Sequence, residues 1–315
     1  MVDSDAGATG FHAGELAVQR RAGVRGAAER LAGMLDAPDL AGGLARFLAE
    51  RTFAGVTARD GAGRLWISPL TGSPGFLEVR GNTDLRVHAA PAAGDPLHDV
   101  VPAQPVGMLA IEFARRRRVR INGTLVDAGS GGLTVHVDQA YGNCPQYIQQ
   151  RLLEPVTPAA GPADAPDSEV RWGHLLDPAD VALIRRADTF LFGTSHPDRG
   201  ADASHRGGLP GFVRVCDDRT LWWPDYPGNN MFNSLGNLAV DPAAALLFVD
   251  FTTGDTVHLS GTARLDWIAS GVGDDGGTGR RVVFTVHAVA AGPPLPLRAG
   301  HVVASPFNPP LHDHI

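Results

Sequence analysis

The chain repeats itself, and this repeat limits the possible folds more than any other feature of the sequence. A stretch that begins at Thr52 and one that begins at Thr189 share residues in the same order, at an offset of 136 to 138 residues up to Thr262. The matched positions include Thr52-Phe53 with Thr189-Phe190, Asp60 with Asp198, Ser68 with Ser204, Pro74-Gly75-Phe76 with Pro210-Gly211-Phe212 and Gly123-Thr124 with Gly261-Thr262. Agreement over this length predicts two copies of one domain.

Each copy has the same order of predicted elements. A short helix comes first, over residues 44–50 in copy one and, after the N-cap candidate Asp177, over 178–186 in copy two. Alternating or β-branched segments predict strands at 53–57, 65–68, 76–80, 85–89, 107–113, 118–127 and 133–139, then at 189–195, 211–216, 220–224, 244–251, 256–265 and 281–290. Roughly six antiparallel strands per copy with few helices predict a mainly β fold of closed barrels with peripheral helices.

The domain boundaries follow from composition. Residues 1–40 form a helical segment, with one amphipathic helix expected over 14–35, and residues 41–156 form copy one. A stretch rich in Pro, Ala and Asp, 157–170, is typical of a linker, and 171–315 form copy two.

Charge and composition exclude several classes of function. The net charge is −7 and the pI is about 5.9, which disfavours nucleic acid as a partner. All 27 basic residues are arginine, so a lysine Schiff base and a P-loop lysine are excluded, and an anion site must use arginine, backbone N–H groups or hydroxyls. The absence of a long apolar run, an acidic N-terminus and only two cysteines predict a cytoplasmic protein without a membrane span or a disulfide framework.

Candidate chemistry is densest in copy two. Residues 203–212, ASHRGGLPGF, join one strand end to the next strand and supply a hydroxyl, a guanidinium and two glycines, which suit a phosphate. Residues 221–238 follow with aromatic side chains for stacking and several amides for hydrogen bonding. The alternative interpretation is two ordinary hairpin turns with a short helix capped by Ser234.

These motifs resemble a known family. The segments SHRGG-PGFV, TLWWPDYPGNN, NSLGNL and ALLFVDFTTGDTVHLSGTARL are similar to the flavin-binding split barrels related to pyridoxamine 5′-phosphate oxidase. The segments FHAGELAVQRRAGV, RRRRVRINGTL, YGNCPQYIQQR and LPLR resemble its tandem-domain, flavin-nucleotide-binding branch. The resemblance covers nearly the whole chain and implies two fused six-stranded split barrels that bind FMN, usually at a two-fold interface.

The resemblance also implies site residues. Ser204 and Arg206 correspond to residues that face the FMN phosphate, and Gly228, Asn229 and Asn230 fall where the family has a Ser-Arg-Lys clamp, so two asparagines replace its basic pair. The expected cofactor-binding set is Ser204, His205, Arg206, Gly207, Gly208, Trp223, Tyr226, Gly228, Asn229, Asn230, Asn237, Asn143, Cys144 and Tyr147.

Copy one departs further from the family pattern. Ser68 is retained, but Leu70 stands where copy two has Arg206, and Ala92-Ala93-Gly94 replaces the clamp. We therefore expect copy one to have lost its own phosphate site and to act as the structural partner that a second subunit provides in simpler dimers.

Other segments carry weaker signals. The run Arg115 to Arg118, with Arg120, is interpreted as a solvated hairpin; alternatively, Arg118 or Arg120 reaches an anionic substrate or the phosphate. His12 and Glu15 match the family segment without an assigned role, and a surface helix start is the simple interpretation. No metal site is expected, because no Cys/His set has zinc spacing and the terminal His312 and His314 are weak candidates.

The sequence thus predicts an FMN-binding oxidoreductase with an unidentified small-molecule substrate, for which pyridoxamine phosphate is only a guess. No catalytic acid or base is assigned, and a homodimer is compatible with the sequence. Two alternatives stay open: a module that stores a flavin, a deazaflavin or a haem without turnover, and a structural barrel without a ligand.

Overall fold

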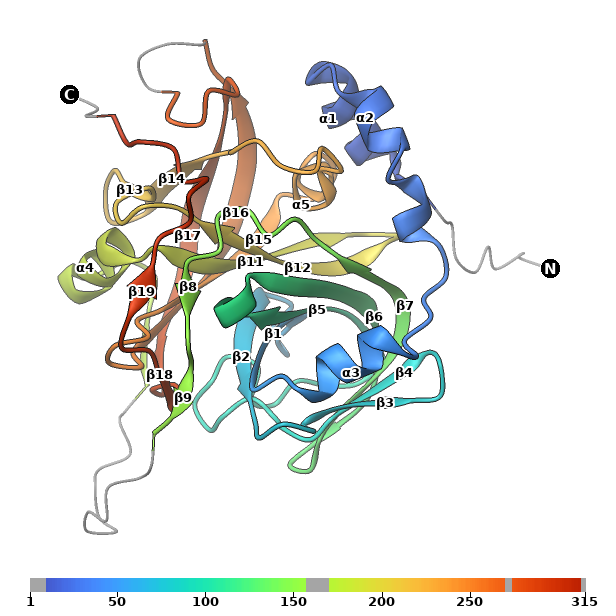
Figure 1. The fold of residues 1–315 in the computed structure, drawn as a ribbon. Helices are drawn as coiled ribbons and strands as arrows, with labels where there is room; N and C mark the ends of the chain where they lie inside the picture. Colours follow the sequence, from blue (N-terminus) through green and yellow to red (C-terminus); the bar gives the residue numbers. More distant parts are fainter. Residues whose placement is uncertain (1–9, 157–169, 270–273, 313–315) are drawn as a thin grey trace.

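Two antiparallel sheets with the same strand order dominate the computed structural model (Figure 1). The structure describes residues 10–156, 170–269 and 274–312. The first sheet, barrel one, has the order β2-β1-β5-β6-β7-β4-β3, and the second, barrel two, has the order β12-β11-β15-β16-β17-β14-β13, with β10 added beside β17. Each strand of barrel one has a counterpart at the same place in barrel two, which confirms the duplication predicted from the repeat.

The strands of barrel one are β1 (Phe53–Arg59), β2 (Leu65–Thr71), β3 (Leu77–Arg80), β4 (Asp84–Val87), β5 (Gln104–Glu112), β6 (Arg117–Gly129) and β7 (Gly132–Gly142). Those of barrel two are β10 (Arg171–Gly173), β11 (Thr189–His196), β12 (Gly200–Gly207), β13 (Arg214–Val215), β14 (Thr220–Pro224), β15 (Ala243–Val249), β16 (Thr256–Trp267) and β17 (Arg280–Gly292).

The two barrels pack against each other mainly through β12, which lies against β5 and β6, and through β2, which lies against β15 and β11. All eight residues of β11 are buried, because one face of this strand covers its own barrel and the other face meets barrel one. A Cβ atom on Gly193 would collide with the side chain of Thr57, so glycine is needed for this close approach. Leu191, also on β11, lies in an apolar cluster that contains residues of both barrels, including Phe53 and Phe113.

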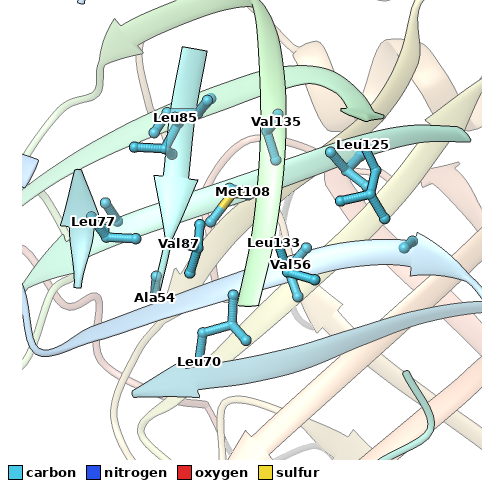
Figure 2. Close-up of a cluster of buried hydrophobic side chains, with 14 of the residues drawn as sticks. Ala54, Val56, Leu70, Leu77, Leu85, Val87, Met108, Leu125, Leu133 and Val135 are labelled. Carbon is cyan, nitrogen blue, oxygen red and sulfur yellow. The ribbon is translucent and has the colours of Figure 1, made fainter. Parts of the chain in front are cut away.

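Each barrel also encloses a core of its own. In barrel one the side chains of Val56, Leu70, Leu85, Met108 and others converge between the strands, as Figure 2 shows. Barrel two has a more aromatic core, in which the rings of Phe190 and Phe192 lie edge-on to Trp223 at centroid distances of 5.0 and 5.3 Å. This burial of aromatic and aliphatic side chains is the main source of stability expected for each barrel.

Helices lie outside the barrels: α1 (Ala13–Arg21), α2 (Arg25–Glu29), the 3₁₀ helix η1 (Ala32–Leu35), α3 (Gly43–Ala49), the 3₁₀ helix η2 (Phe113–Arg115), α4 (Pro178–Arg186) and α5 (Asn233–Leu238). The start of α4 confirms the predicted cap, since the Asp177 side chain accepts hydrogen bonds from two backbone N–H groups and Pro178 follows it.

The last part of the chain ties the barrels together. The strand β18 (Leu297–Arg298) pairs with β9 (Glu154–Pro155), and β19 (Val302–Val303) pairs with β8 (Gln150–Arg151). In Figure 1 this red segment from barrel two runs beside the light green segment that leaves barrel one. The segment after β7 is therefore held in place by the C-terminal residues.

Several expectations need correction. The single helix over 14–35 is three short helices, because Gly23 adopts a left-handed φ of 70° after α1. Residues 203–207, the first half of the connection expected over 203–212, lie in β12, whereas the strand expected over 211–216 is reduced to Arg214–Val215.

Two expected features fall on residues outside the described ranges. They are most of the linker, at 157–169, and His314. Within the ranges that the structure does describe, no helix has the length and apolarity to cross a membrane.

Candidate functional site

A pocket lies where the end of β12 and the loop from β14 to α5 meet barrel one. Barrel one contributes β6 and the segment that follows β7, so both copies of the repeat build the wall. The lining residues are Arg118, Arg120, Asn143, Cys144, Gln146, Tyr147, His205, Arg206, Gly207, Phe212, Pro224, Asp225, Tyr226, Gly228, Asn229, Asn230, Phe232, Asn233, Ser234 and Leu235.

Three arginines converge on this pocket. Arg118 and Arg120 are two residues apart on β6 and therefore share a face of the sheet, and Arg206 comes from β12. Arg120 pairs with the buried carboxylate of Asp202, at 3.0 Å from Nη1 to Oδ2. In the described part of the chain, Arg118 and Arg206 form no ion pair: Arg118 Nη1 lies 2.8 Å from His205 Nδ1, and Arg206 Nη1 donates to Ser204 Oγ at 3.1 Å.

The unpaired arginines make the pocket cationic. Burial and the charges of Arg120 and Arg206 lower the pKa of Arg118 to about 9. Burial and the charge of Arg120 lower the pKa of Arg206 to about 10. Both side chains therefore stay charged at neutral pH, and their mutual repulsion is relieved when an anion binds between them.

His205 holds Arg118 in position, and this contact defines the tautomer of the imidazole ring. A guanidinium group only donates, so His205 Nδ1 accepts the bond from Arg118 and the imidazole proton resides on Nε2. Burial and the charges of Arg118 and Arg206 lower the pKa of His205 well below its ordinary value, which keeps the ring neutral. His205 Nε2 is buried without a hydrogen-bond partner in the described chain.

Aromatic and amide groups form the rest of the wall. The rings of Tyr147 and Tyr226 lie 5.0 Å apart, one from each barrel, and Asn229 Nδ2 donates to Asn143 Oδ1 at 3.1 Å. Asn143 Nδ2 and the Tyr226 hydroxyl are buried and have no hydrogen-bond partner among the described residues. Such orphaned polar atoms are costly unless a ligand or water satisfies them.

The backbone around the pocket is strained. Among the described residues, five non-glycine positions have φ in the left-handed region, and three of these line the pocket: Tyr147 at 62°, Asn230 at 63° and Phe232 at 61°. Gly207 lies so close to the chain that a Cβ atom would collide with the carbonyl oxygen of Tyr147. Strain of this kind tends to accumulate at functional sites, where the surrounding structure holds it.

The structure gathers ten of the fourteen expected residues at the pocket: Asn143, Cys144, Tyr147, His205, Arg206, Gly207, Tyr226, Gly228, Asn229 and Asn230. The other four lie elsewhere. Trp223 is buried in the core of barrel two, and Gly208 packs against Phe212. Ser204 lies behind Arg206 as its hydrogen-bond acceptor, and Asn237 donates to Thr194 Oγ1 at 3.0 Å.

Two further interpretations of the sequence are changed by the fold. The arginine run does not form a wholly solvated hairpin: Arg115 and Arg117 are exposed, whereas Arg118 and Arg120 reach the pocket. Ser234 does not cap α5, because its hydroxyl donates to Asp202 Oδ2 at 2.8 Å.

The sequence reasoning assigned no site role to several lining residues, among them Gln146, Phe212, Asp225, Phe232 and Asn233. All of them neighbour residues that were singled out, in the segments 141–151, 203–212 and 221–238. The sequence therefore indicates which segments line the pocket but not which residues within them do.

Barrel one has no equivalent pocket wall at its matching position. Leu70, in place of Arg206, is buried in the core of barrel one (Figure 2). The repeat aligns Arg120 with His258, and His258 Nε2 lies 3.8 Å from the buried Asp95, whose Oδ1 accepts from Ser68 Oγ at 2.5 Å. The counterpart of the cationic pocket is thus an uncharged leucine, a histidine and a carboxylate.

Comparisons with known proteins agree with this architecture. The model of the pyridoxamine 5′-phosphate oxidase family matches residues 176–267, which lie in barrel two. A search of curated proteins finds no match.

Similar solved structures include HupZ from Group A Streptococcus, 14% identical with a TM-score of 0.31, covering 38% of this chain and 98% of that one. A putative pyridoxamine 5′-phosphate oxidase from Lactobacillus delbrueckii is 16% identical with a TM-score of 0.29, covering 37% of this chain and 94% of that one. HutZ, the haem storage protein from Vibrio cholerae, is 10% identical with a TM-score of 0.27, covering 42% of this chain and 96% of that one.

The matched segment lies in a barrel whose strand order is repeated in the first half of the chain. The chain thus has two barrels of the same strand order, and the pyridoxamine 5′-phosphate oxidase family model matches the second of them.

Proposed function

We propose that this chain binds FMN in the pocket between its barrels and acts as a flavin-dependent oxidoreductase on a small molecule. The observation that carries the proposal is the pair of half-buried arginines, Arg118 and Arg206, that form no ion pair in the described chain and point to an anionic ligand. A phosphate monoester suits two guanidinium groups better than a single carboxylate does, because it offers more acceptor oxygens and more charge.

The residues present also fit the ring of a flavin. The pocket adds aromatic faces from Tyr147, Tyr226 and Phe212 to the cationic end. The orphaned Asn143 Nδ2 and Tyr226 hydroxyl can bond to a heterocycle rich in carbonyl and nitrogen acceptors. The amides of Asn229 and Asn230 stand where the family pattern has basic residues, and Arg118 of barrel one would supply the missing charge.

The protein's own contribution to the reaction is binding and orientation. A bound flavin would supply hydride or electron transfer between a reduced donor and the substrate. Arg118 and Arg206 would hold its phosphate, and the neutral His205 would keep Arg118 in position. The half-buried Cys144 lies in the same wall and is a free thiol, and Tyr147 and Tyr226 would shield the ring from water.

The location and partners of the protein are also proposals. Two free cysteines, Cys144 half-buried and Cys216 exposed, suit a reducing compartment, and we place the protein in the cytoplasm. Because one chain already supplies both halves of the site, catalysis needs no second copy, and a homodimer would be an additional feature.

The test is an absorption spectrum of the purified full-length chain, before and after incubation with FMN and desalting. Retained flavin bands, followed by their bleaching with NADH or NADPH under anaerobic conditions, support the proposal. Retained flavin that no donor reduces indicates storage, and a Soret band or retention of a deazaflavin alone indicates another ligand. A protein that stays colourless after incubation with each of them contradicts the proposal.

A further inference from the structure

A second cavity, of about 840 Å³, lies on the far side of α5 from the cofactor pocket. We call it the α1 cavity, because α1 forms one wall; β6, β7, the turn from β11 to β12, and α5 form others. Its size lies in the range usual for small-molecule sites. Asn233 lines both cavities, and Asp202, in the α1 cavity, accepts a hydrogen bond from Ser234, in the cofactor pocket. One layer of side chains therefore separates the two.

The N-terminal motif is built into this wall rather than lying on the surface. Glu15 is only 3% exposed, which corrects the expectation of a surface helix start. Gly14 and Gly236 leave no room for a Cβ atom between α1 and α5, so the helices touch through their backbones. Asn233 Nδ2 donates to Glu15 Oε1 at 2.6 Å, and the His12 N–H donates to Glu15 Oε2 at 2.8 Å.

Negative charge prevails inside the α1 cavity. Glu15 and Asp202 lie in its depth, and Asp138 and Asp198 lie at its exposed rim. The one lining arginine, Arg199, donates through Nη2 to the Gly10 carbonyl oxygen at 2.8 Å. The charge of Asp202 is balanced by Arg120, whereas no arginine pairs with Glu15 in the described part of the chain.

The histidine and tyrosine rings that line the cavity carry no positive charge that would repel a cation. The rings of His12 and His196 lie 4.3 Å apart at a tilt of 51°, and burial lowers the pKa of each, that of His12 to about 4, so both are neutral at pH 7. Tyr141 is 5% exposed, lines the cavity, and has a buried hydroxyl that faces Arg120. Carboxylates beside aromatic faces are typical of sites for organic cations.

We propose that the α1 cavity binds the second reactant of the flavin reaction, and that this reactant carries a small organic cation which Glu15 holds beside Tyr141. The role as second reactant rests on the proposed function, because it requires a cofactor across the Asn233 wall. The preference for a cation rests on the cavity alone.

Protonation of Glu15 couples this site to pH. Burial raises the pKa of Glu15 to about 7; the groups that face it are His12 on its own segment, Asn233 on α5, Asp202 on β12, Arg199 on the preceding turn and Tyr141 on β7. A bound cation favours the ionised carboxylate, so binding should release a proton and strengthen as the pH rises from 6 to 8.

The experiment uses benzylammonium as the probe, with benzyl alcohol and benzoate as probes of the same shape and different charge. Titration calorimetry on the full chain, with and without FMN, should show that benzylammonium binds more tightly than either, and that Glu15→Gln weakens it roughly tenfold. Glu29→Gln, at an exposed ion pair on α2, should leave binding unchanged. Tyr141→Phe provides a second variant if Glu15→Gln does not fold.

The outcomes separate this inference from the proposed function. A chain that keeps no FMN but prefers benzylammonium supports the cation site and contradicts the flavin proposal. A chain that keeps FMN but binds the three probes alike, or binds benzylammonium equally after Glu15→Gln, overturns the inference. In the FMN-loaded chain, benzylammonium should also shift the flavin absorption bands; binding without such a shift would remove the cavity from the reaction.

Discussion

Replacing Arg206 by alanine separates binding from folding at the proposed phosphate site. The side chain donates to Ser204 Oγ at 3.1 Å and to the His205 carbonyl oxygen at 3.0 Å, and its charge is repelled by Arg120. In the ligand-free protein, the substitution removes two hydrogen bonds and the attraction to Asp225 and Asp202, but it also removes the burial cost of the charge and this repulsion. The free energy of unfolding should therefore change by about 1 kcal/mol or less.

The affinity for FMN should change far more. A hydrogen bond to a charged partner is worth about 1.5–3 kcal/mol, so loss of the Arg206 contact to phosphate should raise the Kd roughly 10- to 150-fold. Quenching of FMN fluorescence during titration measures the Kd, and chemical denaturation measures stability. High salt should reduce the difference between variant and wild type, because a partly exposed pocket is screened.

Two further variants make the interpretation specific. Arg206→Lys keeps the charge and loses the planar fork, so its affinity should lie between those of wild type and Arg206→Ala. Arg115→Ala removes an arginine that is 68% exposed at the hairpin before β6, and FMN binding should be unchanged. A folded Arg206→Ala protein that binds FMN within threefold of wild type would refute the assignment of the phosphate site.

Three other predictions follow from the same geometry. Acid release of flavin from the loaded protein should give one FMN per chain, and a ratio near two would contradict the loss of the barrel-one site at Leu70. Gly207→Ala should destabilise the protein by roughly 1–3 kcal/mol in chemical denaturation and weaken FMN binding, because the added methyl collides with the Tyr147 carbonyl oxygen. The matched Gly228→Ala should be tolerated, since nothing lies within 4 Å, and equal losses in both variants would contradict this reasoning. The third prediction concerns pH. The pKa of Glu15 is raised from 4.5 to about 7, so its contribution to stability is lost as the pH rises from 4.5 to 7. The pKa of His12 is lowered from 6.5 to about 4, so its contribution to the unfolding free energy changes with pH in the opposite direction. Relative to wild type, Glu15→Gln should therefore gain up to roughly 3 kcal/mol of unfolding free energy between pH 4.5 and 7, and parallel pH profiles would show that Glu15 keeps an ordinary pKa.

The regular β structure was predictable because its physical signal is local. Alternating and β-branched segments predicted most strands within a few residues, and the repeat predicted that the two sheets would share one topology. β12 was missed because Gly200–Gly207 contains no β-branched residue. It forms a hairpin with β11 and packs against β5 and β6 of barrel one, and this second set of contacts is not local in sequence.

The pocket was predictable only in part, for a related reason. Arg206 and its neighbours stand out within copy two, but Arg118 and Arg120 are useful there only because barrel one presents β6 to β12. A run of arginines at a hairpin is normally solvated, and no pattern within the run distinguishes the buried members. The contribution of the partner barrel is a property of the assembled fold rather than of any one segment.

Duplication within one chain explains why the two halves of the interface differ so much. Two identical subunits would carry the same site twice, whereas fused copies can diverge independently. The repeat pairs Arg206 with Leu70, Arg118 with Thr256 and Arg120 with His258. All three cations therefore meet at one site.

The matching position has lost these cations and instead buries Asp95, whose pKa is raised by burial. An anion would be attracted at the first position and not at the second, where Leu70 and Asp95 are buried. On this argument, restoring an arginine at position 70 alone should not create a second site, because its partners on β16 are no longer basic.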